Sequence, residues 1–377
     1  MKGDIGVIGL AVMGQNLILN MNDKGFKVVA YNRTTSKVDD FLNGAAKGTQ
    51  IIGAHSLQEL VDKLEKPRKI MMMVRAGSAV DEFIEQIVPY LDKGDILIDG
   101  GNANYPDTNR RCIELADKGI RFIGAGVSGG EEGARHGPSI MPGGDASAWE
   151  FVKPIFQAIA AKTPAGEPCC DWVGDQGAGH FVKMVHNGIE YGDMQLICEA
   201  YQFMKDGLCM THEEMHETFR QWQKTELNSY LIDITTDILA YKDSDGSPLV
   251  EKILDTAGQK GTGKWTGINA LDMGIPLTLI TESVFARCVS ALKDQRTAAA
   301  RLFPHSVCKI EGDRAQWLEA LRQTLLASKI ISYAQGFMLM HEASEIYGWK
   351  LNYGNTALLW RAGCIIRSVF LGNIRDA

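Results

Sequence analysis

A short apolar run at the start of the chain, Asp4–Ile8, leads directly into Gly9-Leu10-Ala11-Val12-Met13-Gly14 and a helical pattern over Met13–Lys24. This order of strand, tight turn and helix matches the G-x-G-x-x-G fingerprint of dinucleotide-binding folds, with alanine in place of the middle glycine. The first glycine allows the turn, the last permits close packing of helix on strand, and the helix N-terminus faces a pyrophosphate. Because this context is correct, a purely structural glycine-rich turn is the weaker explanation. We expect the cofactor to contact Gly9, Leu10, Ala11, Val12, Met13 and Gly14.

Strand and helix patterns continue to alternate up to about residue 175. Short apolar runs bounded by glycine or charged residues predict further strands at Lys27–Tyr31, Lys69–Val74, Asp95–Asp99 and Arg121–Gly124. The alternation predicts an α/β fold with a doubly wound, mostly parallel sheet of the Rossmann type.

After Gly179 the pattern changes to helix after helix without a convincing strand, so we predict an all-α second domain. The predicted helices cover residues 180–206, 212–226, 229–241, 249–257, 278–302, 313–347 and 355–370. We place a nucleotide-binding domain at residues 1–176 and a helical substrate and dimerisation domain at residues 177–377.

Composition narrows the possible functions. The 377 residues carry a net charge of −7, with both signs mixed along the chain. Such a chain is not expected to bind nucleic acid or membranes generally, and an anionic substrate needs a local basic pocket. No run of 18 apolar residues predicts a transmembrane helix, and no signal peptide precedes the first strand. The eight cysteines show no Cys-x-x-Cys pattern, so we expect reduced thiols in the cytoplasm.

The end of the second predicted strand indicates which dinucleotide is favoured. An NAD site usually has an acidic residue about 20 positions after the fingerprint, where it binds the ribose hydroxyls. Here Asn32, Arg33 and Thr34 stand at that place. Arg33 can stack on adenine or pair with a 2′-phosphate, which a carboxylate would repel. We therefore predict NADP rather than NAD. The loop after the next strand is expected to border the cofactor through Val74, Arg75 and Ala76.

Two glycine-rich loops, Asp99–Asn102 and Gly126–Ala134, follow the later strands. Doubly wound sheets bind ligands at this edge, and glycines let backbone N–H groups approach an anion closely. These loops are therefore candidates for substrate binding.

The helical run around Lys183 carries a dense polar stripe. Positions three, four, seven and eight residues after a helical residue share its face. Those positions hold His186, Asn187, Glu190 and Tyr191, so one face presents several proton-handling groups. A solvated face with a Lys–Glu pair is the alternative, but the apolar residues around the stripe favour a cleft.

Three other motifs have weaker support. His212–His216 matches the zinc pattern H-E-x-x-H, but residues 211–214 form a capping box that starts a helix, so we predict no metal site. Gly126–Gly130 matches the nucleophile elbow G-x-S-x-G without an evident triad. Gly258–Lys264 resembles a P-loop, except that Trp265 replaces the required Ser or Thr.

Taken in order, the segments GLAVMG, NRT, DGGN, GVSGGEEGA and KMVHNGIEY resemble the 6-phosphogluconate dehydrogenases of the β-hydroxyacid dehydrogenase superfamily, along essentially the whole chain. Residues 259–266 and 282–287 fit the same pattern. The resemblance implies oxidative decarboxylation of 6-phosphogluconate to ribulose 5-phosphate and CO2, with NADP reduced to NADPH, as in the pentose phosphate pathway and gluconate utilization.

The resemblance also implies roles for individual residues. Lys183 is expected to be the general base, which requires a neutral amine, and then to stabilise the developing enolate once protonated. Glu190 is expected to protonate the enediol carbon. The sugar hydroxyls and carboxylate are assigned to Asn102, which also borders the cofactor, and to Ser128, Gly129, Gly130, His186 and Asn187. The phosphate is assigned to Tyr191, Lys260, Thr262 and Arg287.

The resemblance further implies a homodimer, in which a C-terminal tail reaches the partner subunit and supplies an arginine and a histidine to the phosphate site. The chain stops at Ala377 within a helical pattern, so we expect a fragment without this tail. Two alternatives stay open. One is a 3-hydroxyisobutyrate-type dehydrogenase, which shares the fingerprint and the lysine but lacks the phosphate-binding residues. The other is an NADP-binding protein that is catalytically inactive without its tail.

Overall fold

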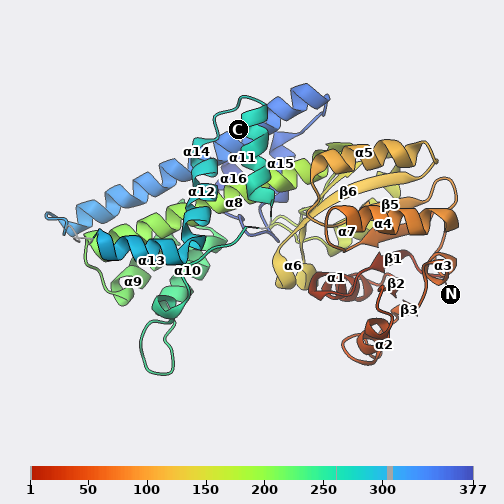
Figure 1. Ribbon diagram of the computed structural model, residues 1–377, viewed down its shortest axis with the longest axis horizontal. Coiled ribbons are helices and arrows are strands. Elements are labelled where there is room, and N and C mark those ends of the chain that lie inside the picture. The colour runs from red at the N-terminus through yellow and green to blue at the C-terminus, as the bar shows by residue number, and fades with distance from the viewer. Residues whose placement is uncertain (1, 260, 304–308, 377) are drawn as a thin grey trace. The chain divides into compact units, whose positions relative to one another are not determined.

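The computed structural model describes residues 2–259, 261–303 and 309–376, and Figure 1 shows its ribbon. The chain forms two compact units. The first ends at Lys183 and also contains Ser344–Cys364, and the second contains Met184–Ala343 and the residues from Ile365 onward. Each unit is thus built from two separate stretches of sequence, and the division expected at residue 176 stays a prediction.

The first unit is built on one sheet of eight strands in the order β3-β2-β1-β4-β5-β6-β7-β8. All neighbouring strands pair in parallel except β6 and β7, which are antiparallel. The predicted doubly wound, mostly parallel sheet is therefore confirmed. The strands are β1 Ile5–Ile8, β2 Val28–Tyr31, β3 Ile52–Ala54, β4 Lys69–Met72, β5 Ile96–Asp99, β6 Arg121–Ser128, β7 Ser139–Gly144 and β8 Gly174–Asp175.

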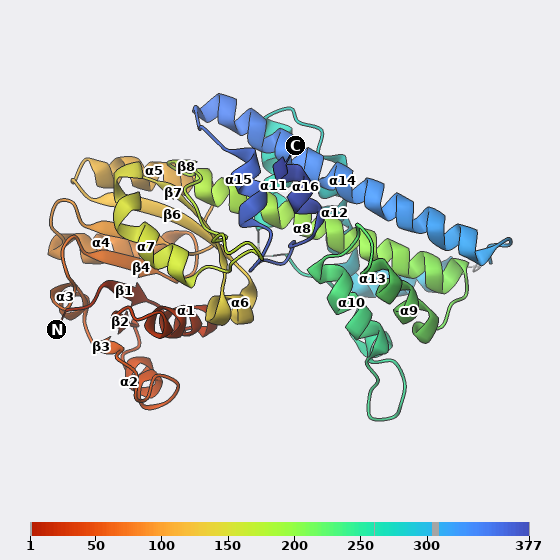
Figure 2. The ribbon, with the colours of Figure 1, turned by 180° about the vertical axis from the view of Figure 1, so that it is seen from behind.

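Helices cover both faces of this sheet, which explains why the central strands are apolar along their whole length. Val7 of β1 belongs to a core cluster that includes Phe156 of helix α7 (Trp149–Ile159), whereas Ile8 packs into another cluster with Phe83 of helix α4 (Ser78–Ile87). Figures 1 and 2 show these two helices from opposite sides of the molecule. The helices of this unit are α1 Val12–Asp23, α2 Ser36–Asn43, α3 Leu57–Asp62, α4 Ser78–Ile87, α5 Tyr105–Ala116, α6 Gly130–His136, α7 Trp149–Ile159 and α15 Tyr353–Leu359.

The second unit is helical, as predicted, and its described residues form isolated bridges but no strand. Helix α8, Ala178–Gln202, starts in the first unit and continues as a central helix of the second. Within the second unit it lies against helix α14, where a side chain on Gly336 would come within 2.7 Å of Ile189. The remaining helices are α9 His212–Trp222, α10 Tyr230–Ala240, α11 Thr262–Asp272, α12 Thr278–Ala291, α13 Lys293–Leu302, α14 Arg314–Tyr347 and α16 Phe370–Asp376.

Several predicted helices in the second unit are wrong in extent. The helix expected at 249–257 is only a short 3-10 turn, Leu249–Lys252. The helix expected at 278–302 is two helices, α12 and α13, because the backbone at Leu292 leaves the helical conformation with a ψ of 52°. The helix expected at 355–370 is likewise α15 followed, after a turn segment, by α16. Within the part of the chain that the structure describes, no helix is long and apolar enough to cross a membrane.

Candidate active site

The turn between β1 and α1 has the geometry that a dinucleotide requires. Gly9 has a φ of +107°, and a side chain there would come within 2.4 Å of the Met73 carbonyl oxygen. A side chain on Gly14 would come within 1.9 Å of the Gly9 carbonyl oxygen, so the helix and the turn are in direct backbone contact. Ala11 stands at the N-cap of α1 without a side-chain hydrogen bond, and no acidic residue lies in the first turn. The helix therefore offers free N–H donors and a positive dipole end to an anion.

A pocket of about 490 Å³ opens beside this turn. Eight residues predicted to bind the cofactor line it, namely Gly9, Leu10, Ala11, Asn32, Arg33, Thr34, Val74 and Arg75. Val12, Met13, Gly14, Ala76 and Asn102 were also predicted and are not among the lining residues. Five residues that the sequence analysis did not assign to the cofactor also line this pocket, namely Ile8, Lys37, Met73, Ala79 and Phe83.

The rim of this pocket is cationic. Arg33, Lys37 and Arg75 all line it and all are exposed. Asn32 fixes the base of the rim, because its Oδ1 accepts a hydrogen bond of 3.1 Å from the Leu10 N–H and its Nδ2 donates to the Thr34 carbonyl at 3.0 Å. A signal for Lys37 was available, since it is a cation in the first turn of α2, three residues after the predicted segment Asn32–Thr34.

The candidate sugar-binding turn follows β6. Gly129 and Gly130 have φ values of +121° and +61°, which non-glycine residues rarely adopt. A side chain on Gly129 would also come within 2.5 Å of the carbonyl oxygen of Gly363, which returns to this unit from the far end of the chain. Two requirements, backbone conformation and close packing, therefore fix glycine at position 129.

Lys183 lies directly on β6. A side chain on Gly126 would come within 2.3 Å of the Lys183 Cβ, and Lys183 itself is only 5% exposed. Residues two apart on a strand point to the same face, so the buried Ser128 side chain shares the face on which Lys183 packs. The structure thus brings Lys183 and Ser128 together, whereas Asn102 is an exposed residue of the loop after β5.

The other predicted residues of the polar stripe belong to the second unit and lie on the same helix, α8, as expected. His186 is fully buried, and its Nδ1 lies 2.9 Å from Asn187 Oδ1 and 3.8 Å from Glu190 Oε2. Asn187 Nδ2 donates to Thr262 Oγ1 at 2.8 Å. The interpretation of this stripe as a solvated helix face is therefore wrong.

The expected phosphate ligands Tyr191, Thr262 and Arg287 gather around the same helix. The guanidinium of Arg287 lies 3.5 Å from the centre of the Tyr191 ring, a cation–π distance. A side chain on Gly263 would come within 2.5 Å of that ring, so this glycine of α11 makes room for Tyr191. Lys260 was predicted for the same group and lies outside the described residues.

The H-E-x-x-H motif, His212–His216, forms the beginning of helix α9. Thr211 Oγ1 accepts from the Glu214 N–H and Glu214 Oε2 accepts from the Thr211 N–H, so the predicted capping box is confirmed. Its histidines have other partners, since His212 lies 3.0 Å from Glu251 and His216 lies 2.9 Å from the Thr236 carbonyl. The described residues contain no cluster of histidine, cysteine and carboxylate side chains suited to a metal.

The residues of the first unit fit a phosphorylated dinucleotide. The glycine turn lets a pyrophosphate approach the backbone, the uncapped α1 N-terminus meets its charge, and the cationic rim suits a further phosphate. No carboxylate lines the pocket to favour an unphosphorylated ribose.

Comparisons with known proteins match one and the same family in both parts of the chain. Residues 4–174 match the family described as the NAD binding domain of 6-phosphogluconate dehydrogenase, and residues 179–377 match its C-terminal domain. The decarboxylating 6-phosphogluconate dehydrogenase of Haemophilus influenzae is 78% identical over 376 residues, which cover 100% of this chain and 78% of that protein. The human enzyme of the same description is 65% identical over 377 residues, with the same coverage.

Solved structures give the same result. The 6-phosphogluconate dehydrogenase of Plasmodium falciparum, studied in its apo form and with NADP+ and 6-phosphogluconate, is 46% identical. It has a TM-score of 0.96 over 99% of this chain and 81% of that chain. A 3-hydroxyisobutyrate dehydrogenase of Mycobacterium tuberculosis is 19% identical, with a TM-score of 0.55 over 86% of this chain and 99% of that chain, which indicates a shared fold alone.

Proposed function

This chain belongs to the 6-phosphogluconate dehydrogenase family, and from that premise we propose how its residues perform the family reaction. The reaction is the oxidative decarboxylation of 6-phosphogluconate to ribulose 5-phosphate and CO2, with NADP as cofactor. The observation that carries the proposal is Lys183, a lysine 5% exposed, packed on β6 beside the Ser128 turn.

The first step oxidises C3 of the sugar acid. Lys183 takes the proton of the C3 hydroxyl while the hydride on C3 leaves, and bound NADP supplies the acceptor for that hydride. A base must be neutral before it accepts a proton, and removal from water disfavours an ammonium charge. The burial of Lys183 therefore supports its role as general base.

The second step breaks the bond between C1 and C2 of the 3-keto acid. The carboxylate leaves as CO2, and its bonding electron pair moves toward C2 as the C3 carbonyl becomes an enolate. Protonated Lys183 returns its proton to that oxygen, which gives the enediol. Glu190 then delivers a proton to the enediol carbon while Lys183 takes back the proton of the adjacent hydroxyl, which forms the ketone of ribulose 5-phosphate. The Glu190 side chain is 17% exposed on the same helix, α8.

The remaining residues recognise the anionic substrate. We assign the sugar hydroxyls and carboxylate to Asn102, Ser128, Gly129, Gly130, His186 and Asn187. We assign the phosphate to Tyr191, Lys260, Thr262 and Arg287. The stacking of Arg287 on Tyr191 supports the second assignment, because it holds a guanidinium, which can pair with phosphate oxygens, beside the Tyr191 ring. Its Nη1 also donates to the Gly258 carbonyl at 3.0 Å and its Nη2 to the Met194 sulfur at 3.1 Å.

We further propose that the protein is a cytoplasmic homodimer of the pentose phosphate shunt. Apolar side chains of the second unit are exposed on α11 and α12, including Leu271 at 77% and Phe285 at 60%. Both line an apolar groove of about 360 Å³, and such a surface is typical of a subunit interface. Seven cysteines in the described residues are free thiols, which supports a reducing compartment. Sedimentation velocity of wild-type protein and of Leu271→Glu tests the dimer, which the substitution is expected to dissociate.

The central experiment measures NADPH absorbance with 6-phosphogluconate, for this chain and for a version extended to the full length of the relatives. NADP is expected to support turnover and NAD to support little. Lys183→Met is expected to lower kcat by about 10²–10⁴-fold or more, with 6-phosphogluconate still bound. Lys205→Met, which replaces a half-buried lysine just beyond α8, is the control. Near-normal turnover in Lys183→Met refutes the base, and no turnover in either wild-type version refutes the reaction.

A further inference from the structure

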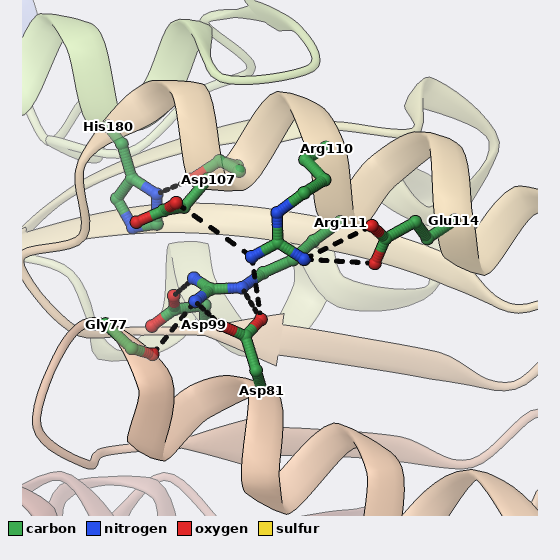
Figure 3. A network of polar contacts seen from close by, with 9 residues as sticks. Gly77, Asp81, Asp99, Asp107, Arg110, Arg111, Glu114 and His180 are labelled. Carbon is green, nitrogen blue, oxygen red and sulfur yellow. Dashed lines mark hydrogen bonds and ion pairs between the residues drawn. The ribbon is translucent and has the colours of Figure 1, made fainter.

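A buried arginine on α5 lies behind the cofactor pocket. Arg111 is 1% exposed and does not line that pocket. Its neighbour Arg110 is on the surface, where it pairs with Asp81 and Glu114. Figure 3 shows the two guanidinium groups side by side, with only that of Arg111 reaching inward toward Asp99. An ion buried this deeply is costly unless its partners are well placed, so the contacts of Arg111 call for an explanation.

On one side Arg111 holds the segment that follows β4. Its Nη2 donates to the Gly77 carbonyl at 3.0 Å and to Asp81 Oδ2 at 3.1 Å, and its Nε donates to Asp81 Oδ1 at 2.8 Å. Gly77 is the N-cap of α4, and Asp81 lies in the first turn of that helix. The planar guanidinium group of Arg111 therefore fixes where the loop ends and where α4 begins.

On the other side Arg111 holds the loop that follows β5. Its Nη1 lies 3.3 Å from Oδ2 of Asp99, the last residue of β5, which is 0% exposed. The other oxygen of Asp99 accepts a hydrogen bond of 3.0 Å from the Gly101 N–H. The guanidinium is thus connected through one carboxylate to the backbone immediately before Asn102.

These two loops touch each other, and the loop after β4 forms part of the wall of the cofactor pocket. A side chain on Gly101 would come within 3.2 Å of the Val74 carbonyl oxygen, so the loops are in backbone contact. Val74, Arg75, Ala79 and Phe83, which flank Gly77 and Asp81 in the sequence, line the pocket itself. Arg111 therefore binds, from the side away from the cofactor, the same backbone that presents the pocket wall.

We propose that Arg111 is a positioning residue for the cofactor, because it ties the loop after β4 to the loop after β5 and so holds Arg75 and Asn102 in place. The inference rests on the proposed function only in taking this pocket as the NADP site. Arginine is needed because its planar fork meets Gly77, Asp81 and Asp99 at once, whereas a lysine ammonium is a single point charge.

Four variants of the whole protein test this role, and the first is Arg111→Met alone. Arg111→Lys keeps the buried charge but loses the fork. Arg111→Met with Asp99→Asn removes both charges, so no carboxylate is left buried without a cation, and it keeps an oxygen for the Gly101 N–H. Arg110→Met is the matched control, because it removes an arginine that pairs with Asp81 but does not reach Asp99 or Gly77. NADPH dissociation constants, KM for NADP, kcat and thermal midpoints are measured for each.

We expect Arg111→Lys to bind NADPH about tenfold more weakly, the size of effect seen for outer-shell partners at other sites. KM for NADP should rise while kcat at saturating NADP stays within about threefold, which is a loss of cofactor binding and not of chemistry. The double variant should have a higher thermal midpoint than Arg111→Met alone and yet keep the weak NADPH binding. Arg110→Met should bind NADPH within about twofold of wild type.

Two results overturn the proposal. One is NADPH binding within twofold of wild type in Arg111→Lys. The other is a double variant that regains both stability and NADPH affinity, because Arg111 then serves only to neutralise Asp99. A failure of the proposed function would be seen in the wild-type protein itself, which would then neither bind NADPH nor reduce NADP with 6-phosphogluconate.

Discussion

Asp99 in the first unit and Asp193 in the second are both buried carboxylates paired with a buried cation, but their partners differ. Each oxygen of Asp99 has its own partner, Arg111 on one and the Gly101 N–H on the other. Asp193 instead presents one oxygen to both Lys329 and Tyr333, and its Oδ1 has no hydrogen-bond partner.

The difference follows from the shape of the cations. A guanidinium reaches several acceptors in one plane, whereas an ammonium on a flexible stem meets a single oxygen well. Asp193 lines a cavity of only about 10 Å³, the lower limit for one water molecule. The Asp99–Arg111 pair, in which both carboxylate oxygens are hydrogen-bonded, can hold two loops in place. In the Asp193–Lys329 pair one oxygen has no partner, so its desolvation is not compensated and the pair adds little net stability.

The largest expected effect comes from breaking the weaker pair. Lys329→Met leaves Asp193 as a buried carboxylate without a cation, because Lys329 is 5% exposed and Asp193 3%. We expect a loss of about 3–5 kcal/mol in the free energy of unfolding, measured by urea denaturation.

Its control removes both charges. Asp193→Leu with Lys329→Met fills the same space with apolar atoms. The free energy of unfolding should therefore return to within about 1 kcal/mol of the wild-type value or exceed it. A double variant as unstable as Lys329→Met would show that the pair has a net stabilising role, and the contrast with Asp99 would then fail.

An exposed cation should show the opposite behaviour, with a large effect on binding and almost none on stability. Arg33→Asp replaces a rim residue of the cofactor pocket by a carboxylate that repels a 2′-phosphate. We expect NADP affinity to fall about 10–100-fold relative to NAD affinity, while the free energy of unfolding changes by less than about 0.5 kcal/mol. Titrations with both cofactors check this, with the exposed Lys47→Asp as a charge-matched control outside the pocket. Undiminished NADP affinity in Arg33→Asp would remove Arg33 from the site.

A buried neutral group of the first unit should give a pH signal. His180 is 1% exposed, its Nδ1 lies 2.7 Å from Thr108 Oγ1, and burial lowers its pKa below the usual 6.5. The unfolded chain therefore takes up a proton near pH 6.5 and the folded chain only at lower pH. Stability due to neutral His180 is complete above pH 6.5 and is lost as the pH falls toward the folded pKa, by about 1.4 kcal/mol per pH unit.

His180→Asn isolates this contribution, because it keeps a polar atom near Thr108 and cannot take up a proton in this range. Urea unfolding at pH 7.5 and pH 5.5 should show a smaller loss of stability in the variant than in wild type. Equal losses in the two proteins would assign the acid sensitivity to other groups.

The smallest expected effect lies on the surface of the second unit. Thr211→Ala removes the N-cap hydrogen bond of α9 and should lower the free energy of unfolding by about 1 kcal/mol. Thr211→Ser keeps the hydroxyl and should be near wild type in the same urea titration. A loss in Thr211→Ala as large as that in Lys329→Met would mean that burial is not what separates strong from weak polar contacts here.

The strands that could be predicted from the sequence are those that are determined by neighbouring residues. β1, β2, β4 and β5 are apolar runs between turn signals, and the structure has them within two residues of the expected ends. β7 was missed because Ser139–Gly144 contains a proline and two glycines, a composition that disfavours strands. It becomes a strand through antiparallel pairing with β6 and parallel pairing with β8, which are tertiary contacts.

The candidate site shows the same division between local and tertiary causes. The motif around Lys183 places the polar stripe on one helix, and that placement was predictable from spacing alone. Helix α11 was not predicted, because Gly263 and Gly267 weaken a helical pattern. Gly263 allows the close approach of the Tyr191 ring, which only the folded unit shows. The hydrogen bonds and ion pairs of Arg111 could not be predicted from the sequence either, since its partners lie 12–34 positions away.

The return of Ser344–Cys364 to the first unit has a consequence for how the protein is made. The hydroxyl of Ser139 donates to the Leu359 carbonyl at 2.7 Å, and the Ser139 N–H donates to the Gly363 carbonyl at 2.9 Å. These acceptors leave the ribosome more than 200 residues after Ser139 does. Domains are generally completed in the order in which they are synthesised, but here the sheet unit must wait, with its Ser128–Gly130 turn unsupported, until the helical unit has been translated. Nascent chains halted before and after residue 364 therefore differ in whether the first unit can close.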